Sequence, residues 1–152
     1  MPLWRGTSIL TRRRAGPGKR LAWLSQLSDE AAVRLVARQD PEVRHPMGPG
    51  TPASLTEVLE RSHAARTRGW AYVHDSFEEG ISAMATAVLG VDGRSAVGVV
   101  SIAGPSLQLT NDRMNELAAP LKAAAVELSG LTGAIAADIN SRRLNHDTAV
   151  TA

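Results

Sequence analysis

The chain contains no cysteine, which excludes disulfide bonds and thiolate metal sites and fits a protein of the cytoplasm. Aromatic side chains are also scarce, with three Trp, one Tyr and one Phe among 152 residues. No apolar run approaches the roughly 20 residues that a helix needs to span a bilayer. The N-terminus is basic, but no apolar segment typical of a signal peptide follows it. We therefore predict a cytoplasmic location and no membrane partner.

The net charge is small but unevenly distributed along the chain. It amounts to +2, yet residues 1–20 contain six Lys or Arg residues and no acidic residue. Such a basic segment suits contacts with phosphates or carboxylates, including those of nucleic acid. No aromatic residue is interleaved with Arg12–Arg14, so a stacking platform for single-stranded nucleic acid is not expected. We interpret residues 1–15 as a basic, solvated segment before the folded domain.

The rest of the sequence predicts an α+β domain with an antiparallel sheet. Apolar runs of period two between Gly69 and Pro105, joined by turn residues, are typical of strands. Among them, Met84–Val91 and Ala96–Ala103 indicate a hairpin around Asp92-Gly93, a dipeptide suited to a type I′ turn. Helical patterns precede and follow the strands. A GAF-like fold, an antiparallel sheet flanked by helices with a long C-terminal helix, fits this order.

Capping residues predict where the helices begin and end. Ser28, Ser54 and Thr110 are expected N-caps, because their side-chain oxygens can accept hydrogen bonds from free helix amides. Gly69 is expected to end the helix that Ser54 begins. Pro120 interrupts the last helical pattern, which predicts a kink or a restart there.

No motif for catalysis or metal binding is present. The four histidines show no HExxH or other metal-ligand spacing, and GxSxG is absent as well. We interpret His63 and His74 as surface or packing residues. The sequence thus predicts a protein without enzymatic activity, metal or cofactor.

Three local features leave a binding role open. Gly16-Pro17-Gly18-Lys19 is not a phosphate-binding loop, because the second half of that motif is absent. Two interpretations remain: an anion site at a helix N-terminus, or a simple helix-entry turn. Asp75, Glu78 and Glu79 can bind a cation or ligand hydroxyls, or form a solvated turn. Ser101, in an apolar strand, either faces a pocket or hydrogen-bonds within the sheet.

Five short motifs in this order resemble the effector-binding domain of the IclR family of bacterial transcription regulators. Gly16-x-Gly18-Lys19 before a helix is similar to the GxGK-like element of that family. Arg68-Gly69-Trp70-Ala71 resembles the RGY-A segment of the family, and Phe77-Glu78-Glu79-Gly80 matches its FEEG motif. Further along the chain, Ser101-Ile102-Ala103-Gly104-Pro105 is similar to SISGP, and Leu109-Thr110-Asn111-Asp112-Arg113 is similar to the LT-x-[DE]-R start of the last helix. The likeness covers roughly residues 15–140.

This resemblance implies a GAF-like domain that binds a small organic or aromatic acid within a dimeric or tetrameric regulator. In the family, an N-terminal winged helix-turn-helix contacts DNA, and none precedes Gly16 here. We therefore expect the ligand-sensing and oligomerising domain of an IclR-type regulator, whose effector modulates DNA binding by an attached or partner domain. The alternative is a stand-alone small-molecule-binding or dimerisation module without DNA-binding activity. The domain is expected over residues 16–142, followed by a flexible tail over residues 143–152.

The resemblance also assigns an effector pocket between the sheet and the helix-entry loop. In that loop Pro17 has no N–H, so one backbone donor of the family is lost. The acidic residue and the cysteine of the family fall on Val73 and Ala83, and the second serine of SISGP falls on Ala103. The first serine is kept as Ser101. The assigned positions are Gly16, Pro17, Val73, Ala83, Ser101 and Ala103.

Most polar contacts of a small-acid pocket are thus absent from the sequence. Asp75, Ser82 and Ser101 are the remaining side chains that can orient a ligand. One hypothesis is a pocket more apolar than usual, which holds a larger or less polar ligand. The other is a degenerate pocket that binds nothing.

Overall fold

The computed structural model describes residues 17–37, 48–76 and 78–149, and it describes side-chain surroundings up to residue 134. These residues form helices and a three-stranded antiparallel sheet, which confirms the predicted α+β class. In chain order the elements are α1 (Pro17–Leu24), α2 (Asp29–Ala37), α3 (Leu55–Arg68), β1 (Ala71–His74), β2 (Ile81–Leu89), β3 (Ala96–Pro105) and α4 (Asn111–Ala149). No helix in these ranges combines the length and apolarity required to cross a bilayer.

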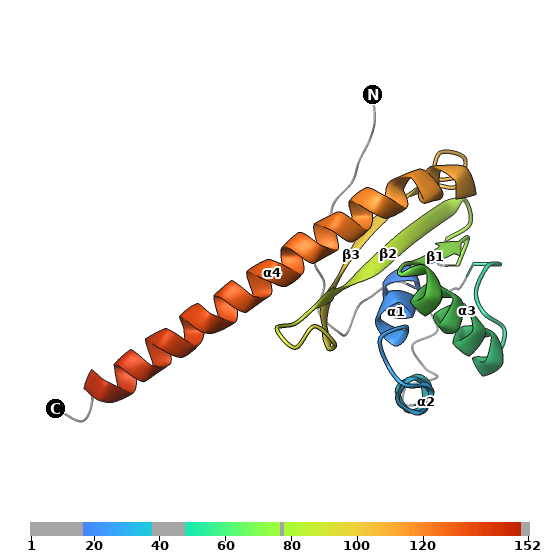
Figure 1. Cartoon of the computed structure of the whole chain (residues 1–152). Helices are drawn as coiled ribbons and strands as arrows, with labels where there is room; N and C mark the ends of the chain where they lie inside the picture. Colours follow the sequence, from blue (N-terminus) through green and yellow to red (C-terminus); the bar gives the residue numbers. More distant parts are fainter. Residues whose placement is uncertain (1–16, 38–47, 77, 150–152) are drawn as a thin grey trace.

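The sheet has the strand order β1-β2-β3, and helices cover both of its faces (Figure 1). Side chains alternate between the two faces along each strand, and cross-strand partners share a face. Tyr72, Met84 and Ile102 are such partners, and they lie on the side of α4. The intervening residues of each strand lie on the opposite side, toward α1 and α3.

The main core lies between the sheet and α4. Met84 of the sheet and Met114 of the helix are both fully buried, at 0 % exposure. Burial of a side chain of this size stabilises the fold by roughly 1.5–3 kcal/mol. The buried members of this core are Trp70, Met84, Val88, Val100, Leu109, Met114, Leu121 and Ala125.

A second cluster fills the other face of the sheet, beneath α1 and α3. Alanines make up much of it, and small side chains let a helix approach a sheet closely. Its buried members are Leu21, Ala22, Ala65, Ala71, Val73, Ala85 and Val99. This is the face on which the sequence predicts the effector.

Local capping signals set the helix limits as predicted. Ser28 Oγ accepts a hydrogen bond from the N–H of Ala31 at 3.3 Å, at the start of α2. Ser54 Oγ accepts from the N–H of Glu57 at 3.2 Å, at the start of α3. Gly69 ends α3 with a φ of 84°, a left-handed conformation that glycine adopts without a Cβ clash. The predictions for Ser28, Ser54 and Gly69 are therefore confirmed.

Helix α4 begins after Thr110, whose Oγ1 accepts from the N–H of Arg113 at 3.3 Å, as predicted. It continues through Pro120, so the restart that was one of the two expectations there does not occur. Met114 and Leu121, on either side of Pro120, are both buried against the sheet. Their packing holds the helix in place where the proline removes a backbone hydrogen bond.

Helix α4 ends at Ala149, so residues 143–149, where a flexible tail was expected, are helical. Residues 150–152 lie outside the described residues. The same holds for the predicted basic segment over residues 1–15, for Gly16, and for Phe77 of the FEEG-like motif.

The loop between β2 and β3 differs from the predicted type I′ turn. Such a turn needs a positive φ at both central residues, but of Asp92 and Gly93 only Gly93 is left-handed, with a φ of 64°. A longer loop is closed instead by the N–H of Gly90, which donates to the Ser95 carbonyl at 2.8 Å. A β-bulge adjoins this loop: Val88 pairs with Gly98 and Leu89 with Ala96, so β3 contains one extra residue, Val97, which shifts the register between the two strands.

Candidate functional site

Four of the predicted effector positions meet on the face of the sheet that α1 covers. Val73 pairs with Ala83 and Ala83 pairs with Ala103, so these residues form a row across all three strands. Ser101 lies on the same face of β3, two residues before Ala103. We call Val73, Ala83, Ser101 and Ala103 the effector row.

Helix α1 covers the β1 and β2 end of the effector row. A Cβ atom added to Gly18 would lie 3.3 Å from Cγ2 of Val73 and 3.5 Å from Cβ of Ala83. Exposure is 6 % at Val73 and 8 % at Ser101, whereas Ala103 is exposed. The row is therefore closed beneath α1 and meets solvent at its β3 end.

The helix-entry loop that the sequence assigns to the effector is described only in part. Pro17 is the first residue of α1, a position where its missing N–H costs no helix hydrogen bond. Gly16 lies outside the described residues. Helix α1 therefore begins within the predicted entry loop, and Gly18, expected in that loop, lies in the helix above the effector row.

Two further predicted residues, Asp75 and Ser82, lie apart from the effector row. Ser82 faces α4, is fully buried, and lies 2.6 Å from His74 Nδ1 and 2.8 Å from Ser106 Oγ. Asp75 Oδ1 accepts from Ser106 Oγ at 3.1 Å and from the N–H of Gly80 at 2.7 Å. The structure thus joins Asp75 and Ser82 to each other through Ser106, on the opposite side of the sheet from Ser101.

The direction of these hydrogen bonds follows from Asp75. A carboxylate only accepts, so Ser106 donates its proton to Asp75 and accepts from Ser82. Ser82 then has no proton left for His74, and it accepts from Nδ1–H of the ring. His74 is therefore not placed to activate Ser82 as a nucleophile, and the full burial of Ser82 bars a substrate as well.

The other ring nitrogen of His74 extends this network to α4. Its Nε2 lies 2.8 Å from Oδ1 of Asn111, the first residue of α4. The network thereby ties β1, β2, the loop after β3 and α4 together, so we interpret it as structural. Within the described ranges no group of three or more His, Asp or Glu side chains could hold a metal ion.

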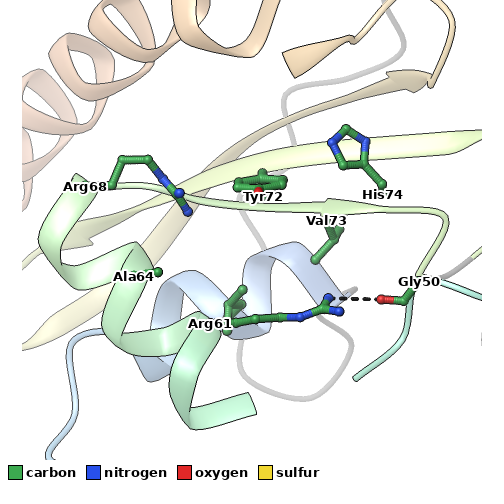
Figure 2. Close-up of a pocket in the computed structure, with 8 residues that line it drawn as sticks. Gly50, Arg61, Ala64, Arg68, Tyr72, Val73 and His74 are labelled. Carbon is green, nitrogen blue, oxygen red and sulfur yellow. Dashed lines mark hydrogen bonds between the residues drawn. The ribbon is translucent and has the colours of Figure 1, made fainter. Parts of the chain in front are cut away.

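A separate hollow of about 340 Å³ lies between α3 and the outer edge of β1 (Figure 2). The predicted residue Val73 contributes to both this hollow and the effector row. Six of the lining residues come from α3 and β1: Arg61, Ala64, Arg68, Tyr72, Val73 and His74.

The guanidinium group of Arg68 stacks on aromatic rings beside this hollow. Its Cζ lies 4.7 Å from the ring centroid of Trp70 and 4.7 Å from that of Tyr72. Its Nε donates to the Trp70 carbonyl at 3.2 Å. Stacking on two rings and one hydrogen bond fix the position of the guanidinium group.

Arg61 is held differently, by oxygen atoms. Its Nη1 donates to the Gly50 carbonyl at 3.0 Å, the dashed line in Figure 2, and its Nη2 pairs with the Glu57 carboxylate. The N–H of Ala53 and the Arg61 guanidinium lower the pKa of Glu57 below its ordinary value, so this carboxyl stays charged near neutral pH.

Sequence reasoning missed the roles of Arg61 and Tyr72, and it saw Arg68 only as part of a motif. The signal was present in the spacing, because residues 61, 64 and 68 fall on one face of a helix. What the spacing does not reveal is that this face meets the edge of β1.

Comparison with known proteins places the chain among transcription regulators. The family model described as bacterial transcriptional regulator IclR C-terminal matches residues 18–130. The Transcriptional repressor IclR of Escherichia coli (strain K12) is 29 % identical over 115 residues, which cover 76 % of this chain and 40 % of that protein. This chain therefore spans well under half the length of that relative.

Solved structures share the fold at low sequence identity. The Agrobacterium tumefaciens repressor BlcR superimposes with a TM-score of 0.67 and 21 % identity, over 76 % of this chain and 46 % of that one. A double mutant of the inducer-binding domain of PobR from Acinetobacter, in complex with 3-hydroxybenzoic acid, superimposes with a TM-score of 0.64 and 20 % identity. The match covers 75 % of this chain and 63 % of that one. At such identities these structures support the fold alone.

Proposed function

The chain belongs to the IclR family of bacterial transcription regulators, matching its C-terminal effector-binding domain, and we propose that it binds a small organic metabolite on the effector row. The bound metabolite modulates DNA binding by an attached or partner domain. In this proposal the domain spans residues 16–142, acts in the cytoplasm, and performs no reaction. The family match over residues 18–130 lies within those limits.

The hydroxyl of Ser101 is the observation that carries this proposal. Ser101 is 8 % exposed, and its Oγ has no hydrogen-bond partner among the described residues, yet this oxygen is not closed off from solvent as that of Ser62 is. A hydroxyl that reaches solvent and has no partner within the chain is free to bond a polar atom of a ligand. Ala83 and Ala103 lie on the same face of the sheet, where the row meets solvent. The free hydroxyl favours a binding pocket over a degenerate one.

The composition of the effector row supports a largely apolar ligand. One hydroxyl among alanine and valine side chains offers a single polar anchor within an apolar surface. An aromatic acid matches this pattern with its flat ring, and 3-hydroxybenzoic acid is the ligand of the PobR domain. The carboxylate of such a ligand would be oriented by the positive end of α1, which begins at Pro17, and by the N–H of the preceding Gly16, because Pro17 has no N–H to donate.

We also propose that the domain forms a homo-oligomer through α4. Thr132 Oγ1 donates to the Leu89 carbonyl at 3.3 Å, close to where α4 leaves the sheet (Figure 1). Residues 134–149 then extend the helix by about 24 Å. Val126 and Leu131 are 71 % and 57 % exposed on the part beside the sheet. A long helix with exposed apolar side chains is typical of a surface that packs against a second copy.

Coupling between effector and oligomer follows from the layers of the fold. The effector row and α4 lie on opposite faces of the same three-stranded sheet. A ligand that shifts the strands on one face therefore also changes how α4 packs on the other face. An effector that binds one arrangement of the subunits more tightly increases its population. The operator affinity of an attached or partner domain then changes through the same equilibrium.

A ligand panel read by thermal shift tests effector binding. A true effector at 100 times its Kd is expected to stabilise the domain by about 2.7 kcal/mol, a clear rise in Tm. Ser101→Ala should weaken binding of that effector by about two- to tenfold, the net value of one neutral hydrogen bond. Ser62→Ala is the matched control, because Ser62 is also buried without a partner but lies on α3.

Two results would contradict the proposal for the effector row. One is a confirmed effector whose affinity is equal in wild type and Ser101→Ala. The other is an effector whose affinity falls equally in Ser101→Ala and Ser62→Ala. Oligomerisation is tested by light scattering after gel filtration, where the double variant Val126→Glu, Leu131→Glu should lower the molecular mass, and an unchanged mass would exclude this surface.

A further inference from the structure

We propose that the hollow between α3 and β1 binds a second ligand, a monocarboxylate with a small apolar or aromatic body. The hollow adjoins the outer edge of β1, whereas Ser101 lies in β3 at the other edge of the sheet. Its volume of about 340 Å³ falls within the roughly 300–1,000 Å³ of small-molecule pockets. Figure 2 shows the Arg68 side chain beside Tyr72 of β1 and the Arg61 side chain extending from α3 toward Gly50.

Arg68 supplies a fixed positive charge with unused donors. Only its Nε is engaged, by the Trp70 carbonyl, so the other four N–H groups of the guanidinium have no acceptor among the described residues. No carboxylate of the described chain pairs with it either. A planar guanidinium held on two rings matches the two oxygens of a carboxylate.

The balance of charge favours an anion with one negative charge. Arg61 is neutralised by Glu57, with which it forms an ion pair on α3. Both ring nitrogens of His74 are already engaged in hydrogen bonds. Arg68 is thus the arginine of the hollow without a carboxylate partner among the described residues, and one carboxylate balances its charge.

The edge of β1 adds a backbone donor to the same hollow. The N–H of Asp75 donates to the Ile81 carbonyl at 2.9 Å, which sets the alternation of the β1–β2 ladder. That alternation directs the N–H and C=O of Tyr72 away from β2, and no described strand pairs with this edge. The Tyr72 amide can therefore donate to a ligand that Arg68 holds.

The walls of the hollow select the body of the ligand. Leu21, Ala64 and Val73 contribute apolar surface, and the edge of β1 at Tyr72 completes this part of the lining. A carboxylate with an apolar body gains from these walls, whereas inorganic phosphate does not. Benzoate is the simplest molecule with both features.

Benzoate titration into the ¹⁵N-labelled full chain, at constant ionic strength, tests the site by NMR. We expect saturable shifts of the Arg68 and Tyr72 signals and weaker binding of inorganic phosphate. Arg68→Gln should weaken the binding of benzoate by about 10- to 100-fold. Arg68→Lys keeps the charge but loses the paired N–H donors of the guanidinium group, so it should weaken binding by less. Arg94→Gln, the same loss of charge in the exposed β2–β3 loop, should leave the Kd unchanged.

A second variant keeps the test decisive if loss of Arg68 unfolds the chain. Ala64→Leu fills the hollow from an exposed position of α3 and keeps both arginines, so it should abolish benzoate binding without lowering Tm. Benzoate shifts confined to Ser101 and its neighbours, or an unchanged Kd in the folded variants, would overturn the proposal. Phosphate binding as tight as benzoate binding would overturn the carboxylate assignment. Ser101→Ala should not affect this site, which separates it from the effector row.

Discussion

Gly18 at the start of α1 lies directly against Val73 of β1, and a Cβ atom at Gly18 would be 3.3 Å from Val73 Cγ2. This contact sets how closely α1 covers the effector row. Gly18→Val places two further carbons in a space that Val73 already fills. We expect it to lower the free energy of unfolding by about 1–3 kcal/mol, measured by urea denaturation.

A double-mutant cycle distinguishes this crowding from a change in helix propensity. Val73→Ala removes the opposing methyl groups, so Gly18→Val should cost less in that background than in wild type. Gly130→Ala in α4 is the control, because nothing lies within 4 Å of a Cβ added there. It should raise stability by about 0.5–1 kcal/mol. Equal costs of Gly18→Val in both backgrounds would show that the two residues are not in contact.

Replacing two buried serines with alanine is expected to have different effects on the stability of the fold. Ser62 is 1 % exposed and its Oγ has no partner, so Ser62→Ala should be neutral or raise Tm. Ser76 is 0 % exposed and donates to the carbonyls of Gly50 and His74, at 2.9 Å and 3.1 Å. Ser76→Ala should therefore cost about 1–3 kcal/mol. Calorimetry of the two variants compares them directly, and a loss in Ser62→Ala as large as that in Ser76→Ala would contradict the assignment.

Features determined by neighbouring residues could be predicted from the sequence. Ser28, Ser54 and Gly69 act on amides or carbonyls within four residues of themselves, so short patterns identify them. The antiparallel sheet followed from alternation in the same way. Pro120 was harder, because distant packing decides whether a helix passes through a proline.

The grouping of site residues depended on register, which local patterns do not fix. A two-residue turn at Asp92-Gly93 would pair Ser82 with Ala103 and so place it on the face of Ser101. The extra residue Val97 in β3, opposite Val88 and Leu89, shifts the register, and Ser82 pairs with Gly104 instead. A shift of one residue exchanges the faces of a strand, so Ser82 faces α4.

The carboxyl group of Asp92 should titrate far below its usual range. Hydrogen bonds from the Ser95 hydroxyl and from the N–H groups of Arg94 and Ser95 lower the pKa of Asp92 to about 2. A lowered pKa in the folded state means that the stabilisation is present above pH 3.8 and is lost as the pH falls toward 2. NMR titration of the side-chain carbon measures this pKa directly.

Ser95→Ala tests the cause of that shift. The hydroxyl of Ser95 is the strongest of these donors, so its removal should raise the pKa of Asp92 toward 3.8. The two backbone donors remain, which should keep the pKa somewhat below that value. A pKa near 3.8 in wild type, or no change in Ser95→Ala, would show that the loop does not hold Asp92 in this way.

Asp75 combines an unusual backbone conformation with a terminal place in the hydrogen-bond network. Its φ of 47° makes it the one non-glycine residue of the described chain in the left-handed region. Asn tolerates that conformation and still offers Oδ1 to Ser106, so Asp75→Asn should change the free energy of unfolding by less than about 1 kcal/mol. Asp75→Val loses the acceptor and strains the backbone, because a β-branched side chain is disfavoured there. We expect it to cost about 2–4 kcal/mol in urea denaturation.

Ser106→Ala separates the two contributions at Asp75. It removes the donor to the carboxylate but leaves the backbone at Asp75 unchanged. If the network matters, Ser106→Ala should cost about 1–3 kcal/mol, because Ser82 then loses its acceptor in a fully buried site. Asp75→Val in that background should add only the cost of backbone strain and of the lost acceptor for the Gly80 N–H. Full additivity of the two losses would mean that Asp75 and Ser106 do not interact, and that the left-handed backbone alone makes position 75 sensitive.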